Sequence, residues 1–365
     1  MKKITCLIVF SIGLALLALV PGHLQAQNVS TLPLGDKYKH YYDSLKNMEY
    51  DRVFPILGKK AYKAGFDVPF PLGVMVNSFY GTQNIDISNI HVGFRGPDGT
   101  LGPVDLSNVI HFQSVSAKGL NMNARADMWV FPFLNVYALL GVLPNAETKV
   151  VLDKPVSITS NPSQSGMTYG FGIMGAGGVG PVWIQADFNF TWANMQLLEN
   201  KVFTRISGVR VGHTFRLKDP QKNISFWMGA MAIILNNETK GEIALADVFP
   251  DIDQSKIDEI KASYENWYDD LGPAQKQVMD KIVEKLQDKV NGLHLKDDYI
   301  TYEMDKKPSS RWAGLAGAQY QFSKRWQLRV ESNFISGGDR YSVLASINYR
   351  FFGAKTKKAN HASQP

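Results

Sequence analysis

The stretch "LNMNARADMWV", residues 120–130, alternates strictly between two kinds of side chain. Its even-numbered positions are all apolar, from Leu120 to Val130, whereas its odd-numbered positions include Arg125 and Asp127. Successive side chains of a β-strand point to opposite faces, so the segment predicts a strand with one apolar face and one polar face. The same period of two recurs in "VWIQADFNFTW" (182–192) and "YSVLASINYRFF" (341–352).

Segments of this kind predict ten strands. They lie at residues 73–80, 116–130, 134–142, 167–178, 182–193, 202–216, 224–235, 312–322, 326–334 and 341–352. Most have about ten residues or more, enough to cross a bilayer, whereas strands of soluble proteins average about five or six. Charged side chains in the middle of a strand also fit the polar interior of a membrane barrel.

The connections between these strands alternate in length. The second, fourth, sixth and eighth are short, whereas the first, third and seventh cover residues 81–115, 143–166 and 236–311. Odd and even connections of an up-and-down barrel emerge at opposite ends, and outer-membrane barrels have short periplasmic turns and long outer loops. The sequence therefore predicts an all-β barrel over residues 71–352 in the bacterial outer membrane. It has about ten antiparallel strands, or twelve if residues 84–94 also pair as a strand.

Two segments precede the expected barrel. Lys2 and Lys3, an apolar run over residues 4–20 and a small residue at Ala26 predict a signal peptide at 1–26, with an uncleaved anchor helix as the alternative. Cys6, the only cysteine, lies in this peptide. Residues 27–70 form a partly helical lead segment, either periplasmic or inserted in the lumen. After the barrel, residues 353–365 predict a basic, disordered tail.

The long connection at 236–311 predicts a helical insert on the extracellular side. Its segment "PAQKQVMDKIVEKLQDKVNG" (273–292) begins with proline, ends with glycine and carries an apolar stripe. The stripe consists of Val278, Ile282, Val283, Leu286 and Val290. An exposed apolar stripe has to be buried, so the helix packs on a helical partner, caps the barrel mouth or binds a surface partner.

Strand phase directs one set of charged residues into the lumen. These are Arg125, Asp127, Asp187, Arg329, Glu331 and Arg350. Enclosed charges must be paired, so the set forms either a structural salt-bridge core or a narrow polar conduit or ligand pocket. A second set, of aromatic residues near short turns or the last strand end, predicts a girdle at the membrane interface. Its members are Phe131, Phe133, Trp183, Phe322, Trp326, Tyr349 and Phe351.

Other chemistry has little support. "GAGGVG" (175–180) matches the dinucleotide spacing G-x-G-x-x-G, but Pro181 and a strand follow it instead of a helix. The glycines are expected to allow a tight turn and to let aromatic rings pack over the preceding strand. We expect no nucleotide, nucleic acid, metal or cofactor. The one hydrolase site that can be named would use His91 or His111 with Ser114.

Several segments together resemble a family of uncharacterised bacterial outer-membrane β-barrel proteins. The resemblance rests on "DMWVFPFLNVYALLG" (127–141), "FNFTW" (188–192), "RWAGLAGAQYQFSKRWQLRVESNF" (311–334) and "SVLASINYRF" (342–351). It implies outer-membrane lipid and the barrel assembly machinery as partners, because "YRF" at 349–351 resembles the terminal signal that this machinery reads. We expect a non-enzymatic barrel that binds or passes a small solute through a largely filled lumen. A structural or surface-interaction barrel is the alternative, and a lipid-acting hydrolase comes third.

Overall fold

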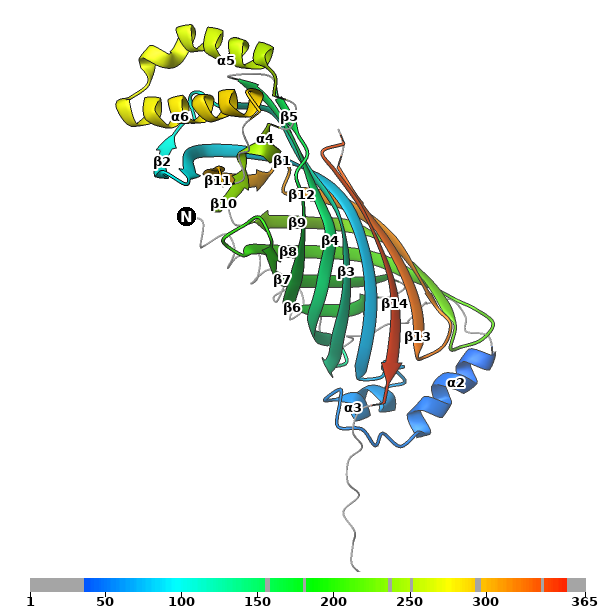
Figure 1. Cartoon of the computed structure of the whole chain (residues 1–365). Coiled ribbons are helices and arrows are strands. Elements are labelled where there is room, and N and C mark those ends of the chain that lie inside the picture. Colours follow the sequence, from blue (N-terminus) through cyan, green and yellow to red (C-terminus); the bar gives the residue numbers. More distant parts are fainter. Residues whose placement is uncertain are drawn as a thin grey trace, which may run out of the picture.

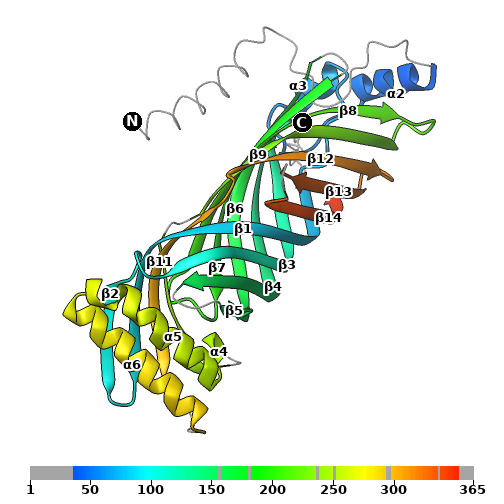
Figure 2. The same ribbon diagram turned by 90° about the horizontal axis from the view of Figure 1, so that it is seen from above.

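The structure is a computed structural model that describes residues 36–154, 158–179, 182–235, 238–249, 252–292, 297–335 and 338–352. Ten antiparallel strands form a closed barrel (Figures 1 and 2). They are β1 (Leu72–Gly96), β3 (His111–Phe131), β4 (Leu134–Lys154), β6 (Ser163–Val179), β7 (Val182–Met195), β8 (Val202–Arg216), β9 (Asn223–Leu235), β12 (Trp312–Gln321), β13 (Trp326–Phe334) and β14 (Arg340–Phe351). The last strand closes the barrel by pairing with the first, from Leu72↔Phe351 to Gln83↔Arg340. The ten-stranded prediction is confirmed.

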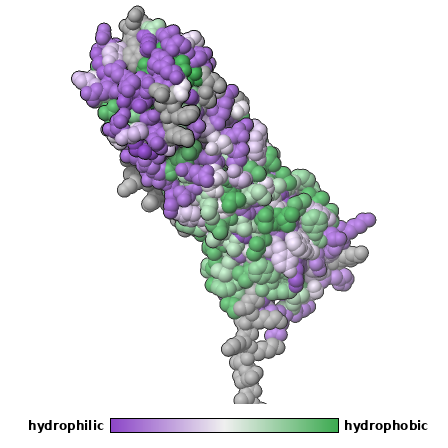
Figure 3. Space-filling model, viewed as in Figure 1, coloured by the Kyte–Doolittle hydropathy of each residue, from purple (hydrophilic) through white to green (hydrophobic). Residues whose placement is uncertain are grey.

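The outer surface of the barrel is apolar. Large exposed side chains alternate along its strands, among them Val76, Leu140, Phe171, Met228 and Ile347. Figure 3 shows hydrophobic residues gathered in a band over the lower part of the visible face, with hydrophilic residues above. A closed barrel with such a band satisfies every strand hydrogen bond internally and presents an apolar exterior to lipid. The chain is a membrane-spanning barrel of the outer-membrane type. Separately, no helix in the described ranges is long and apolar enough to cross a membrane.

Residues 84–94 are a strand, but they do not raise the barrel from ten strands to the alternative of twelve. They continue β1 beyond the barrel, where β1 loses both barrel neighbours after Asn84 and pairs instead with β11 (Tyr299–Pro308) and β2 (Gly99–Asp105). The Asn84 carbonyl accepts a hydrogen bond from the Ser309 N–H at 3.1 Å, which starts the new pairing. A bulge between Ser88 and His91 then bends the strand, with Asn89 in the left-handed region that asparagine tolerates.

The outer end of β1 belongs to a separate folded unit, which we call the headpiece (residues 84–110 and the described part of 238–308). Its sheet has the order β10-β11-β1-β2, where β10 is Glu238–Ala244. Its helices are α4 (Leu245–Val248), α5 (Gln254–Trp267) and α6 (Pro273–Val290), with a 3-10 turn at Tyr268–Asp270. Figures 1 and 2 show the helices beside this sheet, at the same end as the short strand β5 (Ile158–Ser160). All the long connections thus gather at one end of the barrel.

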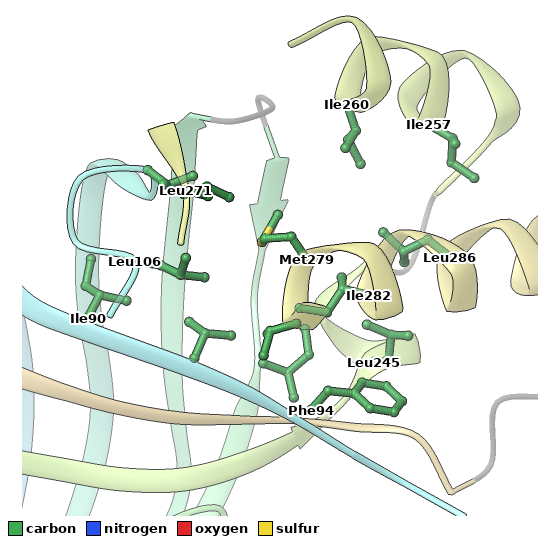
Figure 4. Packing of buried hydrophobic residues seen from close by; sticks show 14 residues of the cluster. Ile90, Phe94, Leu106, Leu245, Ile257, Ile260, Leu271, Met279, Ile282 and Leu286 are labelled. Atoms are coloured by element: carbon green, nitrogen blue, oxygen red, sulfur yellow. The ribbon is translucent and has the colours of Figure 1, made fainter. Parts of the chain in front are cut away.

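A buried apolar core holds the headpiece together. The predicted helix at 273–292 is α6, and its residues Val278, Ile282 and Leu286 are at most 6% exposed. Figure 4 shows side chains of α5 and α6 pointing toward one another and toward Phe94 on the sheet. The stripe therefore packs on both a helix and a sheet. The sheet was not predicted. It buries apolar residues of α6 that the helical partner alone would leave exposed.

The lead segment has its helices at the end of the barrel with the short turns (Figure 1), and its Phe70 carbonyl accepts a hydrogen bond from the lumen residue Arg350 at 3.5 Å. It contains α2 (Asp36–Asn47) and α3 (Gly58–Lys63). Its contacts reach strand ends on different sides of the barrel: Ile56 N–H donates to the Val130 carbonyl at 2.8 Å, and Lys324 pairs with Asp67 at 2.8 Å. The expected signal peptide at 1–26 and the tail at 353–365 lie outside the described residues.

Candidate functional site

The lumen is crossed by a chain of hydrogen bonds, here called the lumen network. It includes the six charged residues that strand phase directed inward, together with five others. The members are Arg125, Asp127, Asn135, Tyr137, Asp187, Asn189, Arg210, Trp227, Arg329, Glu331 and Arg350.

One part of the lumen network centres on Arg210 of β8. Its Nε and Nη2 donate to Glu331 on β13 at 2.7 and 2.8 Å, and its Nη1 donates to Asp187 on β7. Glu331 also accepts from Arg329 at 2.7 Å and from the Trp227 indole at 2.8 Å. Because β9 and β12 lie between β8 and β13 in the sheet, the Arg210–Glu331 pair spans the lumen. Both residues are at most 7% exposed, so each charge depends on its partner.

The other part centres on Asp127 of β3. Arg350 approaches this carboxylate to 3.2 Å across β1, and the Asn135 amide donates to it at 2.8 Å. Arg125 donates to Asn135 at 3.0 Å and places its guanidinium 3.5 Å from the centre of the Tyr137 ring. This cation–π contact stabilises an arginine that has no carboxylate of its own in the described structure.

Tyr137 and Asn189 join the two parts. The Tyr137 hydroxyl donates to Asn189 at 2.6 Å, and the Asn189 amide donates to Asp187 at 2.8 Å. Glycines make room for the rings on this face: a Cβ at Gly172 would overlap Tyr137, and one at Gly317 would overlap Trp227. Gly172 belongs to the strand before "GAGGVG", where room for an aromatic ring was expected; Gly180 and Pro181 lie outside the described residues.

Most of the predicted girdle aromatics form ring pairs near the short turns. Phe131 and Phe133 stack at 5.5 Å between centroids, Trp326 lies 4.8 Å from Tyr349, and Tyr349 stacks on Phe351. Phe322 is 47% exposed. Trp183 differs, because it shares its face with Asp187 and lies 6.0 Å from Trp227. Trp183 therefore faces the lumen, as its odd-numbered position in β7 should have indicated, because the odd positions of this strand face inward.

Above the lumen lies an apolar cavity of about 300 Å³, here called the chamber. It lies between the headpiece and the parts of β3 and β4 that extend beyond the barrel. Its walls are aliphatic and aromatic except for Thr148, Ser160, Gln164, Tyr302 and Lys306. The apolar lining comprises Ile85, Ile87, Ile90, Val92, Leu106, Ile110, Phe112, Val115, Val150, Leu152, Pro162, Leu197, Leu198, Ile243, Val248, Phe249, Ile260, Met279, Ile282, Val283, Leu286, Ile300 and Met304.

The chamber continues the inner face of the barrel. Ile85 and Ile87 have the same parity on β1 as Asn77, which is 7% exposed and hydrogen-bonded at 2.7 Å to Asn123 on β3. Val115 likewise follows the inward parity of Arg125 on β3. The inner surface therefore changes from polar to apolar where β1 leaves the barrel. No motif predicts this, because it depends on three chain segments that meet only after folding.

The other candidate residues give no further site. His111 lies 3.5 Å from Asp153, and His91 approaches the Asn89 carbonyl at 3.3 Å, so neither geometry points to Ser114. Within the described ranges, no group of three or more His, Cys, Asp or Glu side chains could hold a metal ion.

Several solved structures are similar to this chain. No protein-family model matches it, and no curated protein matches its sequence. It is similar to the β domain of the Bordetella autotransporter BrkA (12% identity, 77% of this chain and 100% of the other, TM-score 0.34). It is also similar to the outer membrane protein OprG from Pseudomonas aeruginosa (8%, 78% and 98%, TM-score 0.34). A third is the translocator domain of the autotransporter NalP from Neisseria meningitidis (10%, 80% and 92%, TM-score 0.29). The particular uncharacterised family expected from the sequence finds no support here.

The lumen network predicts a poorly conducting barrel. Ion-paired side chains cross the lumen, and the lead segment contacts the barrel at the short-turn end. We expect single-channel recordings in planar bilayers to show small openings or none. Large, stable openings like those of a general porin would contradict a filled lumen.

Proposed function

We propose that this protein is an outer-membrane binding barrel that captures a small apolar molecule in the chamber. The long-loop end is then extracellular, the barrel is the scaffold, and the role involves no chemical step. The observation that carries the proposal is the chamber itself: a concave, almost wholly apolar cavity with a few polar groups, on the inner face of the wall. Small-molecule sites have this character, with volumes of about 300–1,000 Å³. A purely structural or surface-interaction barrel does not account for such a cavity.

The driving force for capture is the transfer of apolar ligand surface out of water. Each CH₂ group buried contributes about 0.8 kcal/mol, so even a short alkyl chain binds measurably if the chamber admits it. Helix α6 forms one wall, with Met279, Ile282, Val283 and Leu286, and β4 forms another, with Val150 and Leu152. A larger side chain on either wall removes the space without changing the charge.

A photo-crosslinking experiment tests the proposal. The barrel is placed in lipid nanodiscs, because detergent tails would compete for the chamber, and is exposed to dodecanol that carries a diazirine near its chain end. Mass spectrometry of the irradiated protein is expected to find two labelled regions. One is the lipid-facing band, which serves as an internal reference, and the other is the chamber lining on α6, β1 and β11.

Val283→Trp is expected to abolish chamber labelling and to leave band labelling intact. Val150→Phe, on the opposite wall, should act in the same direction. Glu284→Trp is the matched control, because Glu284 is the exposed neighbour on the same helix. Chamber labelling that is absent from the wild type, or unaffected by both filling variants, would show that the cavity is not a binding site.

A further inference from the structure

The apolar wall of the chamber contains one charged side chain among its described residues, Lys306. Of the same described residues, Tyr302 is the other that titrates. The Lys306 ammonium lies 5.4 Å from the centre of the Tyr302 ring, and within the described structure it has no carboxylate partner. Its neighbour Lys307 points to the opposite face of β11, is exposed and lies 3.9 Å from Asp86. Two adjacent lysines on one strand are thus in opposite environments.

The position of Lys306 along the chamber follows from the strand register. On β11 it pairs with Ile87, two pairs from Pro308↔Ile85 and close to the point where β1 leaves the barrel. Ile300 lies on the same face of β11 but at the other end of the strand, where it packs in the apolar core of the headpiece. The chamber therefore has one polar end, near the barrel, and an apolar remainder.

The lumen face below Lys306 carries another cation with spare donors. Arg340 pairs with Gln83 on β1, four residues nearer the short-turn end than Ile87, and is 4% exposed. Its Nη2 donates to the Ser310 carbonyl, while its Nε and Nη1 have no hydrogen-bond partner in the described structure. The described residues of the inner face at this junction thus include the cations Lys306 and Arg340, and the chamber lining among them has no carboxylate, which favours an anionic ligand over a cationic one.

An unpaired ammonium in an apolar wall is costly unless a ligand supplies the counter-ion. Burial lowers the pKa of Lys306 to about 8. The side chain is therefore still protonated at neutral pH, but it binds its proton less tightly than an exposed lysine does. A carboxylate placed against Nζ would stabilise the charge through a charge-assisted hydrogen bond. Among the described lining residues, the other polar side chains are Thr148, Ser160, Gln164 and Tyr302, which are too few to bind a large polar headgroup.

We propose that the chamber binds a single-chain fatty carboxylate, with the carboxylate on Lys306 and the alkyl chain among the apolar side chains toward Ile300. The inference rests on the proposed function and adds the class of ligand. The carboxylate supplies the charge that Lys306 lacks, and the aliphatic lining accepts the chain. A neutral alcohol of the same length fills the same space without the ion pair.

Competition against the dodecanol photoprobe tests this inference in the same nanodiscs. Laurate at pH 7 is expected to displace chamber labelling at a concentration at least about tenfold lower than unlabelled dodecanol, given the strength of hydrogen bonds to charged groups. Dodecyltrimethylammonium should be weaker than either. Lys306→Met should remove the advantage of laurate, whereas Lys307→Met should leave it unchanged. Displacement by dodecanol serves as the folding control for each variant.

The advantage of laurate should also depend on pH. Lys306 is charged below about pH 8 and loses its proton above it, so laurate should become a weaker competitor as the pH rises from 7 to 10. Tyr302 does not titrate over most of this range, because burial, with Glu199 nearby, raises its pKa to about 12. Dodecanol should show no such change, and neither should laurate with Lys306→Met.

The outcomes separate the two proposals. If the wild type shows no chamber labelling, the proposed function fails, and the fatty-carboxylate inference fails with it. If labelling occurs but laurate and dodecanol compete equally, or Lys306→Met does not alter laurate, the chamber is a binding site and this inference alone is wrong. Stronger competition by dodecyltrimethylammonium would also overturn it.

Discussion

Replacing Arg210 with alanine is expected to lower the free energy of unfolding by about 3–5 kcal/mol, because the change leaves buried carboxylates without their partner. Arg210 is 7% exposed, donates twice to Glu331 and once to Asp187, and connects three strands that are not all neighbours. Arg329 still contacts Glu331 in the variant, but Asp187 keeps only the Asn189 amide. The measurement is urea-induced unfolding of the purified barrel, followed by tryptophan fluorescence.

Two further variants show whether the loss comes from the charge contacts. Arg210→Lys keeps the charge but cannot reproduce the bidentate contact with Glu331, so we expect a loss smaller than that of alanine. Arg205→Ala removes an exposed arginine from the same strand and should change the unfolding curve little. Equal losses from Arg205→Ala and Arg210→Ala would show that the lumen network does not stabilise the barrel.

The barrel could be predicted from the sequence because its signal is local. Each strand alternates on its own, so "LNMNARADMWV" already separates a lipid face from a lumen face, and the direction of Arg125 and Asp127 follows. Arg210 was missed although the same signal was present, since it alternates with Val209 and Val211 in β8. The other missed members of the lumen network, such as Asn135 and Asn189, are uncharged. Their role depends on which strands face each other across the closed barrel.

The headpiece shows where local signals fail. "YITYEMDKK" (299–307) alternates as clearly as a barrel strand, placing Ile300, Tyr302 and Met304 on one face, but it lies within a long connection interpreted as helical. Residues 84–94 were recognised as a possible strand, yet alternation does not tell which strand is the neighbour. Pairing of β11 with β1 joins residues more than 200 positions apart. Lys306 faces the chamber only through that pairing, so no sequence pattern could have singled it out.

The end of the barrel that carries the headpiece is expected to face the outside of the cell. Labelling of single cysteines on intact cells should therefore be complete at that end and absent at the other. With Cys6 replaced by serine, a single cysteine at Asp269 should react with an impermeant maleimide on intact cells. The Asp269 side chain, in the turn between α5 and α6, is fully exposed at 101%. Lys281, also in the insert, is a poorer site because its side chain is 21% exposed and pairs with Glu284 at 3.0 Å. Asp269 is therefore the better labelling site of the two, because its side chain is accessible to the maleimide.

Lys222→Cys probes the opposite end of the barrel in the same labelling experiment. Lys222 is 45% exposed in the short turn between β8 and β9, so its thiol should react only after the outer membrane is breached. The physical reason is that a closed barrel fixes its two ends on opposite sides of the bilayer, and short turns lie on the periplasmic side in outer-membrane barrels. The reverse pattern would place the headpiece in the periplasm. The chamber would then receive its ligand from inside the cell envelope, and capture from the outside would be excluded even if fatty carboxylates bind.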